Sequence, residues 1–209
     1  MTPRGPGRPS VQAERRAQII DAFIILVAER GLQAVTLTDV AERAGVMRPA
    51  IRHHVGNRDE LIAATFETLA QRYDKRAAQE IGQTPTIDSV VAYLFGDAYT
   101  SSSDIDDQAF NAFLGEARRN EGLAVGIHAT YTGTINTIAD VVFAERPEVA
   151  HPEAQALAYQ VLCLAEFNVD MQRLGFVSEW SRATADTADQ ILRTGRAPHA
   201  APASSAVRG

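Results

Sequence analysis

A short stretch near the N-terminus, from Arg48 to His54, gathers side chains that suit contact with nucleic acid. Arg48 and Arg52 carry guanidinium groups, which pair with phosphates and can make two hydrogen bonds to a guanine edge. His53 and His54 add planar side chains, and Ala50 adds a short one, for contacts with base edges. This chemistry is recognition and not bond making, so it depends on an element that presents these residues on one face.

The surrounding segment, Thr38 to Leu61, predicts such an element, namely two short helices joined through a glycine. We expect Thr38 to cap the first helix, Gly45 to end it and Pro49 to lie in the first turn of the second. Helices this short are not stable alone, so they must share a core. The residues predicted to form that core are Val40, Ala41, Val46, Ile51 and Val55. The pattern predicts a helix-turn-helix; the alternative is the same motif used only for packing.

Longer helices flank this motif on both sides. Apolar residues at helical spacing from Ile19 onward predict a first helix that stops at Gly31, and Asn57 is expected to cap a long fourth helix. Further helices are expected over residues 87–99, 104–120, 123–144, 152–174 and 177–194. The predicted fold is all-α, with an N-terminal three-helix DNA-binding domain over residues 11–57 and a larger C-terminal helical domain over residues 58–195.

Charge is distributed unevenly along the chain of 209 residues, whose net charge is -6. Nine basic residues face five acidic ones through Arg58, whereas eleven face twenty-one in the rest. A basic head on an acidic body suggests that only the head meets an anionic partner. Residues 1–10 are expected to form a flexible basic arm in which Arg4 and Arg8 resemble a loosened AT-hook for the minor groove; the alternative is a solvated tail. Residues 196–209 are predicted to be a disordered tail.

Residues 15–66 resemble the helix-turn-helix region of TetR-family repressors. The matching features, at fixed spacing, are the Thr38 cap, Ala41, the Ala44-Gly45-Val46 turn, Ile51, His54 and the exit Asn57-Arg58-Asp59-Glu60-Leu61. The chain departs from the family pattern at Arg52, where the family usually has Tyr, and at Val55, where Phe is common. Because that tyrosine is generally a phosphate contact in the family, the resemblance implies that Arg52 keeps this contact with a charged group.

The resemblance also implies which residues touch DNA. We expect Arg48 to contact a base, with two hydrogen bonds to a guanine, and Pro49 and Ala50 to meet a thymine methyl group. Thr38 and Arg52 are expected at phosphates, together with His54 and Arg58. The predicted DNA-binding residues are Thr38, Met47, Arg48, Pro49, Ala50, Arg52, His53, His54 and Arg58, together with Arg4 and Arg8 of the arm.

The last two predicted helices are interpreted as a dimer interface. The helix over residues 152–174 is apolar almost all round, so it must be covered on more than one side. In TetR-family proteins the last two long helices of each subunit form a four-helix interface, and a two-fold dimer places two recognition helices about 34–36 Å apart on a palindromic operator. The alternative is a monomer that buries both helices. The predicted interface residues are Leu157, Val161, Leu164, Asn168, Trp180, Thr184, Thr187, Ala188 and Ile191.

The C-terminal half of such proteins usually binds a small molecule that changes the spacing of the two DNA-binding heads. The sequence does not identify this effector. The residues expected to face it are Phe110, Phe113, Leu114, His128, Tyr131, Asn136, Glu166, Phe167 and Asp170. Each has a plainer interpretation as a core or surface side chain. Cys163 is predicted to be a buried hydrophobic residue.

The predicted function is a sequence-specific, ligand-responsive transcriptional repressor that binds a double-stranded DNA operator as a homodimer. A ligand-free architectural DNA-binding protein and an all-helical enzyme are the alternatives. The chain shows no His-Glu-x-x-His pair, phosphate-binding glycine loop or nucleophile elbow, so we predict no catalytic residue, cofactor or metal. Its longest apolar run is too short for a membrane helix, and it carries no export signal, from which we expect a cytoplasmic location and no membrane partner.

Overall fold

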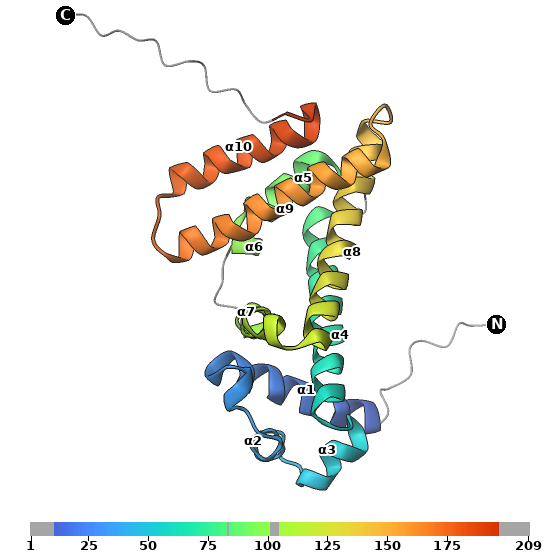
Figure 1. Ribbon diagram of the computed structural model, residues 1–209, viewed down its shortest axis with the longest axis vertical. Coiled ribbons are helices and arrows are strands. Elements are labelled where there is room, and N and C mark those ends of the chain that lie inside the picture. Colours follow the sequence, from blue (N-terminus) through green and yellow to red (C-terminus); the bar gives the residue numbers. More distant parts are fainter. Residues whose placement is uncertain (1–10, 83, 101–104, 197–209) are drawn as a thin grey trace, which may run out of the picture. The chain divides into compact units, whose positions relative to one another are not determined.

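The computed structural model describes residues 11–82, 84–100 and 105–196, and this part of the chain is helical throughout, without a β-strand (Figure 1). The fold is therefore all-α, as the sequence predicts. The predicted arm with Arg4 and Arg8, and the predicted tail from residue 197 onward, lie outside the described residues. None of the helices in the described part is both long and apolar enough to span a membrane.

Internal contacts divide the described residues into two compact units, one built from residues 11–76 and 105–131 and the other from residues 77–82, 84–100 and 132–196. The first unit contains the helix-turn-helix together with helices from later in the chain. Its elements are α1 (Val11–Arg30), η1 (Leu32–Ala34), α2 (Leu37–Arg43), α3 (Arg48–His54), most of α4 (Arg58–Ile81), α7 (Ile105–Glu116), η2 (Ala117–Arg119) and the beginning of α8 (Glu121–Glu145). The functional boundary predicted after residue 57 stays a prediction.

Aromatic rings form the centre of the first unit. Phe23 of α1 and Phe113 of α7 are both fully buried, and their ring centroids lie 6.2 Å apart. Phe66 of α4 lies 4.9 Å from Phe113 and 6.0 Å from Phe110, in tilted and edge-on arrangements that aromatic pairs prefer. This cluster joins α1, α4 and α7, so the inner face of α1 is covered by residues some 90 positions further along the chain.

The guanidinium group of Arg72 reinforces this core at its edge. Arg72 of α4 pairs with Asp21 of α1 and, at 2.7 Å, with Asp106 of α7. Beside it, burial raises the pKa of the Tyr73 phenol, and the Asp107 carboxylate raises it further, so this hydroxyl stays protonated and donates to Asp107. Charged and aromatic contacts thus hold the same three helices together.

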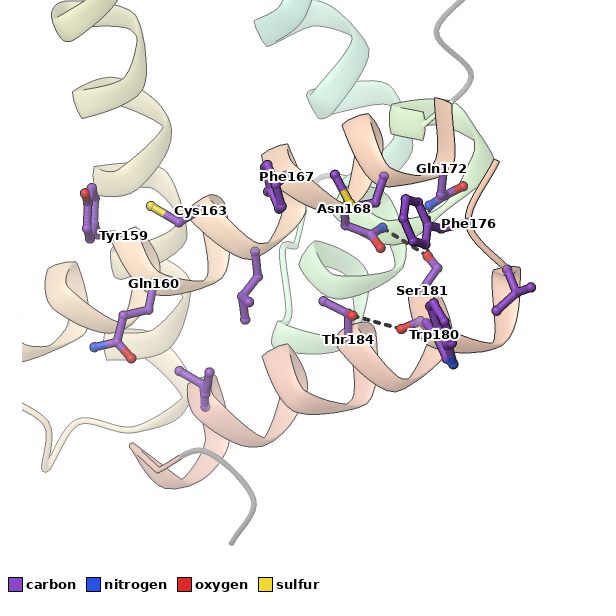
Figure 2. A pocket seen from close by; sticks show the side chains of 14 residues that line it. Tyr159, Gln160, Cys163, Phe167, Asn168, Gln172, Phe176, Trp180, Ser181 and Thr184 are labelled. Carbon is purple, nitrogen blue, oxygen red and sulfur yellow. Dashed lines mark hydrogen bonds between the residues drawn. The ribbon is translucent and has the colours of Figure 1, made fainter. Parts of the chain in front are cut away.

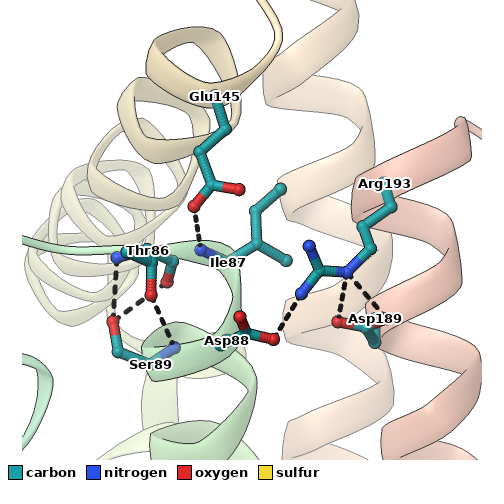
Figure 3. Close-up of polar contacts among 7 residues, drawn as sticks. All are labelled: Thr86, Ile87, Asp88, Ser89, Glu145, Asp189 and Arg193. Atoms are coloured by element: carbon teal, nitrogen blue, oxygen red, sulfur yellow. Dashed lines mark hydrogen bonds and ion pairs between the residues drawn. The ribbon is translucent and has the colours of Figure 1, made fainter.

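The second unit consists of α5 (Ile87–Phe95), α6 (Asp97–Thr100), the later part of α8, α9 (His151–Arg173) and α10 (Ser178–Thr194). Helix α5 packs against α9 and α10, and these two long helices pack against each other. Figure 3 shows how polar groups fix the start of α5: Thr86 and Ser89 form a capping box, and Glu145 of α8 accepts a hydrogen bond from the Ile87 backbone N–H at 2.7 Å. Arg193 of α10 pairs with Asp88 and Asp189.

The predicted helices exist, with corrections to the limits of some of them. The helix expected over residues 87–99 is broken at Gly96, where a side chain would bring Cβ to 2.3 Å from the Ala92 carbonyl oxygen. Only glycine permits that approach, so α5 stops at Phe95 and α6 follows. The helix expected over residues 104–120 ends at Glu116 and continues as the 3-10 turn η2.

The start of α2 was predicted wrongly. Its N-cap is Thr36 and not Thr38: the Thr36 hydroxyl accepts from the Asp39 N–H at 3.2 Å, and the Thr36 N–H donates to the Asp39 carboxylate at 2.8 Å. Thr38 is the second residue of α2 and has an exposed side chain. The Thr36 hydroxyl also donates to the Asp39 carboxylate, and this hydrogen bond, together with the one from the Thr36 N–H, holds the pKa of the Asp39 carboxyl below its ordinary value. By contrast, Asn57 caps α4 as predicted, through reciprocal hydrogen bonds with Glu60.

Replacing the observed cap tests this assignment. Thr36→Ala is expected to lower the free energy of unfolding by about 1 kcal/mol, because it leaves an N–H of the first turn without its acceptor. Thr38→Ala is the matched control, with an expected change below about 0.5 kcal/mol. Urea denaturation followed by circular dichroism measures both, and a larger loss for Thr38→Ala would contradict the capping box.

Candidate nucleic-acid interface

Helices α2 and α3 meet through a tight turn centred on Gly45. Gly45 has a φ of 63°, in the left-handed region that favours glycine. Its N–H donates to the Glu42 carbonyl at 3.2 Å, and the Val46 N–H donates to the Ala41 carbonyl at 3.0 Å, so the last carbonyls of α2 are satisfied. Val40, Ala41, Ile51 and Val55 are buried, as predicted, and Val46 is half-buried against the same core. The chain therefore forms a packed helix-turn-helix.

The predicted DNA-binding residues fall mainly on the outer face of this motif. Arg48, Arg52 and His53 are exposed on α3, and Met47 just before it is 79% exposed. Thr38 and Pro49 are also exposed, whereas Ala50 and His54 are half-buried. The structure thus brings eight of the predicted residues to one motif, and their contact with DNA stays a prediction.

The arginines of the head fall into two groups. Arg43 pairs with Glu29 at 2.9 Å and Arg30 pairs with Asp39 at 3.5 Å, so both of these side chains link α1 to α2. Arg48 and Arg52 have no ion pair or hydrogen bond with any side chain in the described part of the chain. Their positive charge is therefore available to an external anion, and the basic residues that stabilise the motif are different from those that it presents.

Arg58 belongs to the first group, contrary to the expected phosphate contact. Its guanidinium donates to the backbone carbonyls of Leu32 and Val35, both at 2.6 Å, and its side chain is half-buried. These carbonyls lie in the connection between α1 and α2, so Arg58 ties the first residue of α4 to the base of the helix-turn-helix. The place of Arg58 in the segment after α3 led to the prediction of a phosphate contact. The sequence pattern could not show whether its guanidinium donates to a backbone carbonyl or to a phosphate.

The end of α3 is a pair of imidazoles. The rings of His53 and His54 meet edge to face with centroids 4.9 Å apart. Nδ1 of His54 is buried and has no hydrogen-bond partner among the described residues. A proton on that atom would bury an unsatisfied N–H, so Nε2 is the ring nitrogen that is suited to carry a hydrogen. His54 can then donate one hydrogen bond outward, as a phosphate contact requires.

The nine residues predicted to face an effector do not form one group. Phe110, Phe113 and Tyr131 are part of the aromatic core of the first unit, and Leu114 and His128 have exposed side chains. In the second unit, Asn136 accepts a hydrogen bond from Gln155 at 2.8 Å, Glu166 accepts one from Tyr99, and Asp170 pairs with Arg173. Phe167 is 63% exposed. For Phe110 and Phe113, the plainer interpretation as core residues fits their burial.

The second unit carries an apolar groove between α9 and α10, with a volume of about 700 Å³. Tyr159, Cys163 and Phe167 follow one another at four-residue spacing along α9, and Phe176 and Trp180 line the other side (Figure 2). Their exposure is high, at 59% for Tyr159 and 61% for Trp180. Cys163 is exposed too, so its predicted burial is wrong.

A polar trio lies within this groove. The Ser181 hydroxyl accepts from Asn168 at 3.0 Å and from Gln172 at 2.8 Å (Figure 2). Asn168 is among the few polar side chains of the described residues that are buried. The three residues fix the register of α9 against α10 at the end of the groove near Trp180.

Five of the nine residues predicted for the dimer interface are buried within the second unit. Leu157, Val161, Asn168, Ala188 and Ile191 are buried within the unit itself, so a partner cannot cover them. Leu164, Thr184 and Thr187 are half-buried, and Trp180 is exposed. The exposed face of α9 instead carries Tyr159, Cys163 and Phe167, whose i, i+4 spacing is the signal of one helix face. Because α9 is apolar almost all round, the i, i+4 spacing alone does not show which of its faces is exposed to solvent.

Comparisons with known proteins agree with this geometry. Residues 19–65, which contain α2 and α3, match the family model described as bacterial regulatory proteins, tetR family. The HTH-type transcriptional repressor KstR2 of Rhodococcus jostii (strain RHA1) is 26% identical over 66% of this chain and 65% of its own length. The HTH-type transcriptional regulator CymR of Pseudomonas putida is 28% identical over 62% of this chain and 64% of its own length. The chain thus matches just under two thirds of each of these two relatives.

Solved structures share the whole fold. A TetR-family transcriptional regulator from Cytophaga hutchinsonii has a TM-score of 0.72 at 15% identity, covering 90% of this chain and 97% of that one. A protein from Saccharomonospora viridis in complex with choline has a TM-score of 0.69 at 14% identity, covering 88% and 98%. The fold and the motif define a helix-turn-helix protein with a helical C-terminal region. Residues 19–65 are thus similar to the tetR family of bacterial regulatory proteins, and the helices of the described part share the fold of the solved structures.

The two groups of arginines can be separated experimentally. Arg58→Met is expected to lower the free energy of unfolding by about 1–3 kcal/mol, because two backbone carbonyls lose a charged donor. Arg48→Ala, which removes an unpaired exposed side chain, is expected to change it by less than about 0.5 kcal/mol. Urea denaturation of both variants measures the difference. Equal stability of Arg58→Met and the unmodified protein would assign Arg58 to the DNA surface instead.

Proposed function

We propose that the protein is a sequence-specific DNA-binding transcriptional repressor that acts as a homodimer on a palindromic operator and responds to a small molecule. The observation that carries the proposal is the outer face of α3, where Arg48 and Arg52 are exposed and have no partner among the described side chains. A charged face without internal partners on a packed helix-turn-helix suits the major groove of DNA. This function would place the protein in the cytoplasm, with the chromosome.

The positions along α3 suggest a division of tasks. Arg48 begins the helix, and residues at the N-terminal end of a recognition helix are those that reach base edges. Arg52 lies one turn further, where a guanidinium can pair with the phosphate backbone, and the Nε2–H of His54 can make a second phosphate contact. Pro49 and Ala50 offer small apolar surfaces to a thymine methyl group.

Dimerisation is supported by the groove of α9 and α10. Tyr159, Phe167 and Trp180 are each more than half exposed along this groove, and contiguous exposed apolar surface marks an interaction site. Burying the same face of a second copy would remove it from water through a self-complementary, two-fold contact. The dimer is part of the proposal because a palindromic operator requires two recognition helices about 34 Å apart.

A small-molecule effector is supported by the fold's relatives. The protein from Saccharomonospora viridis was solved in complex with choline, so a protein of this fold can hold a small molecule. An effector must bind the DNA-free and DNA-bound forms with different affinity, and the coupling is reciprocal. A ligand-free architectural protein would show no such coupling with any compound.

The division of tasks on α3 predicts a different effect on DNA binding for each of two substitutions. After selection of a preferred site from random DNA, Arg48→Ala is expected to lower preference for that site over others by about 1–3 kcal/mol, because a base contact is lost. Arg52→Ala is expected to weaken binding to all sequences alike and to reduce the slope of log affinity against log salt by about 1. Gel-shift titrations at several salt concentrations measure both quantities. Unchanged preference in Arg48→Ala would refute the base contact.

The proposed interface predicts a monomeric variant. Phe167→Glu is expected to convert a dimer into a monomer, because it would bury two carboxylates at a two-fold contact. Phe143→Glu is the matched control, since Phe143 is 44% exposed on α8 and does not line the groove. Light scattering coupled to size-exclusion chromatography measures the mass of each. A monomeric unmodified protein, or a dimeric Phe167→Glu, would contradict this interface.

A further inference from the structure

The first unit contains a second groove, of about 600 Å³, between α4 and the beginning of α8. Ile62 and Phe66 of α4 and Leu123 of α8 form its apolar floor, and all three are largely buried. The small side chains of Ala63 and Ala70 leave it open along α4. None of the residues predicted for the effector lines this groove.

A glycine in the wall keeps the groove open, although the backbone conformation at this position does not require glycine. Gly126 lies within α8, and a Cβ added there would meet the Phe66 ring at 3.8 Å, an ordinary van der Waals distance. Its φ is not in the left-handed region, so alanine or a larger residue would be compatible with the helix. Glycine inside a helix costs about 1 kcal/mol relative to alanine. The chain therefore carries an unfavourable residue at the position where a side chain would begin to fill the groove.

The charges on the walls of the groove are of one sign. Asp59 and Glu67 are the charged residues that line it, and neither has an ion pair in the described part of the chain. Asp59 lies in the first turn of α4, where the helix dipole favours a carboxylate, but Glu67 lies in the middle of the helix without such support. The Asn120 side chain already accepts from the Leu123 N–H at 3.1 Å, so the start of α8 is capped. The groove is an apolar surface with an uncompensated negative charge.

We propose that this groove binds an organic cation with an apolar body. The cationic group would lie near Glu67 and Phe66, since an aromatic ring as well as a carboxylate attracts a cation, and the apolar body would cover Ile62 and Leu123. The sign of the wall charge favours a cation over an anion or a neutral compound. A helix of another protein would need far more apolar surface than these few residues provide.

The groove is linked to the DNA-binding motif through adjacent residues. Asp59 follows Arg58, whose guanidinium holds the Leu32 and Val35 carbonyls at the base of the helix-turn-helix. A ligand that shifts the first turn of α4 therefore changes the support of α2 and α3. In this role the cation would be the effector of the proposed repressor, and this part of the inference rests on the proposed function.

Tetraphenylphosphonium and tetraphenylborate are suitable probes because they have the same shape and opposite charge. Calorimetry with the full chain is expected to show saturable binding of the phosphonium and binding of the borate weaker by about an order of magnitude. Glu67→Gln is expected to weaken phosphonium binding about fivefold, the effect of one charge at close range in water. Gly126→Leu, which fills the groove, is expected to abolish it. Gly133→Leu is the control, because it changes an exposed glycine of the same helix that has no atom near its Cβ position.

Equal binding of both probes, or unchanged phosphonium binding in Gly126→Leu with the control also unchanged, would overturn the site. The link to DNA is measured separately, as the operator affinity with and without saturating phosphonium. If phosphonium changes the operator affinity of the unmodified protein but not that of Gly126→Leu, the effector role is supported. If phosphonium binds and the operator affinity does not change, the effector role is overturned. If the chain bound no DNA at all, the proposed function would fail while calorimetry would still decide the site.

Discussion

A helix of seven residues is not stable by itself in water, and both helices of the helix-turn-helix have this length. Every other feature of the first unit can be understood as support for them. Thr36 supplies the hydrogen bonds that begin α2, and ion pairs join α2 to α1. Arg58 then holds the connection from the side of α4. Since these contacts use internal partners, α3 needs none of its own charged side chains for stability and can present them outward.

The aromatic cluster extends this support to the rest of the unit. A helix-turn-helix positions its recognition helix only as well as the longer helices behind it are fixed. Phe23, Phe66 and Phe113 set the spacing of α1, α4 and α7, and Arg72 binds the same three helices at their edge. Two kinds of interaction with different dependence on salt therefore maintain one geometry, because screening weakens the exposed ion pairs but not the packing of buried rings.

Much of the first unit could be predicted from the sequence because its signals are local. The Gly45 turn, the Asn57 cap and the apolar positions of α2 and α3 depend on residues within a few positions of one another. The start of α2 was predicted wrongly because Thr36 and Thr38 are both suitable N-cap residues. The Asp39 carboxylate accepts a hydrogen bond from the Thr36 N–H, and this makes Thr36 the cap. Arg58 shows the other limit, since a guanidinium suits a carbonyl as well as a phosphate and only the fold brings the Leu32 and Val35 carbonyls into reach. In α9, apolar on nearly every face, the sequence cannot say that Val161 points inward and Cys163 outward.

The compact body that carries α3 is assembled from two separated stretches of chain, with α7 and the beginning of α8 joined to α1 through α4. Phe113 covers Phe23, and Gln33 donates to Glu116 at 2.9 Å across the same contact. A genetic exchange with a protein of the same fold at a point after α3 would therefore pair the α1 of one parent with the α7 of the other. The helix-turn-helix is thus not a contiguous module that can be moved by itself, whereas substitution of the exposed residues of α3 leaves the contacts of α1 with α7 intact.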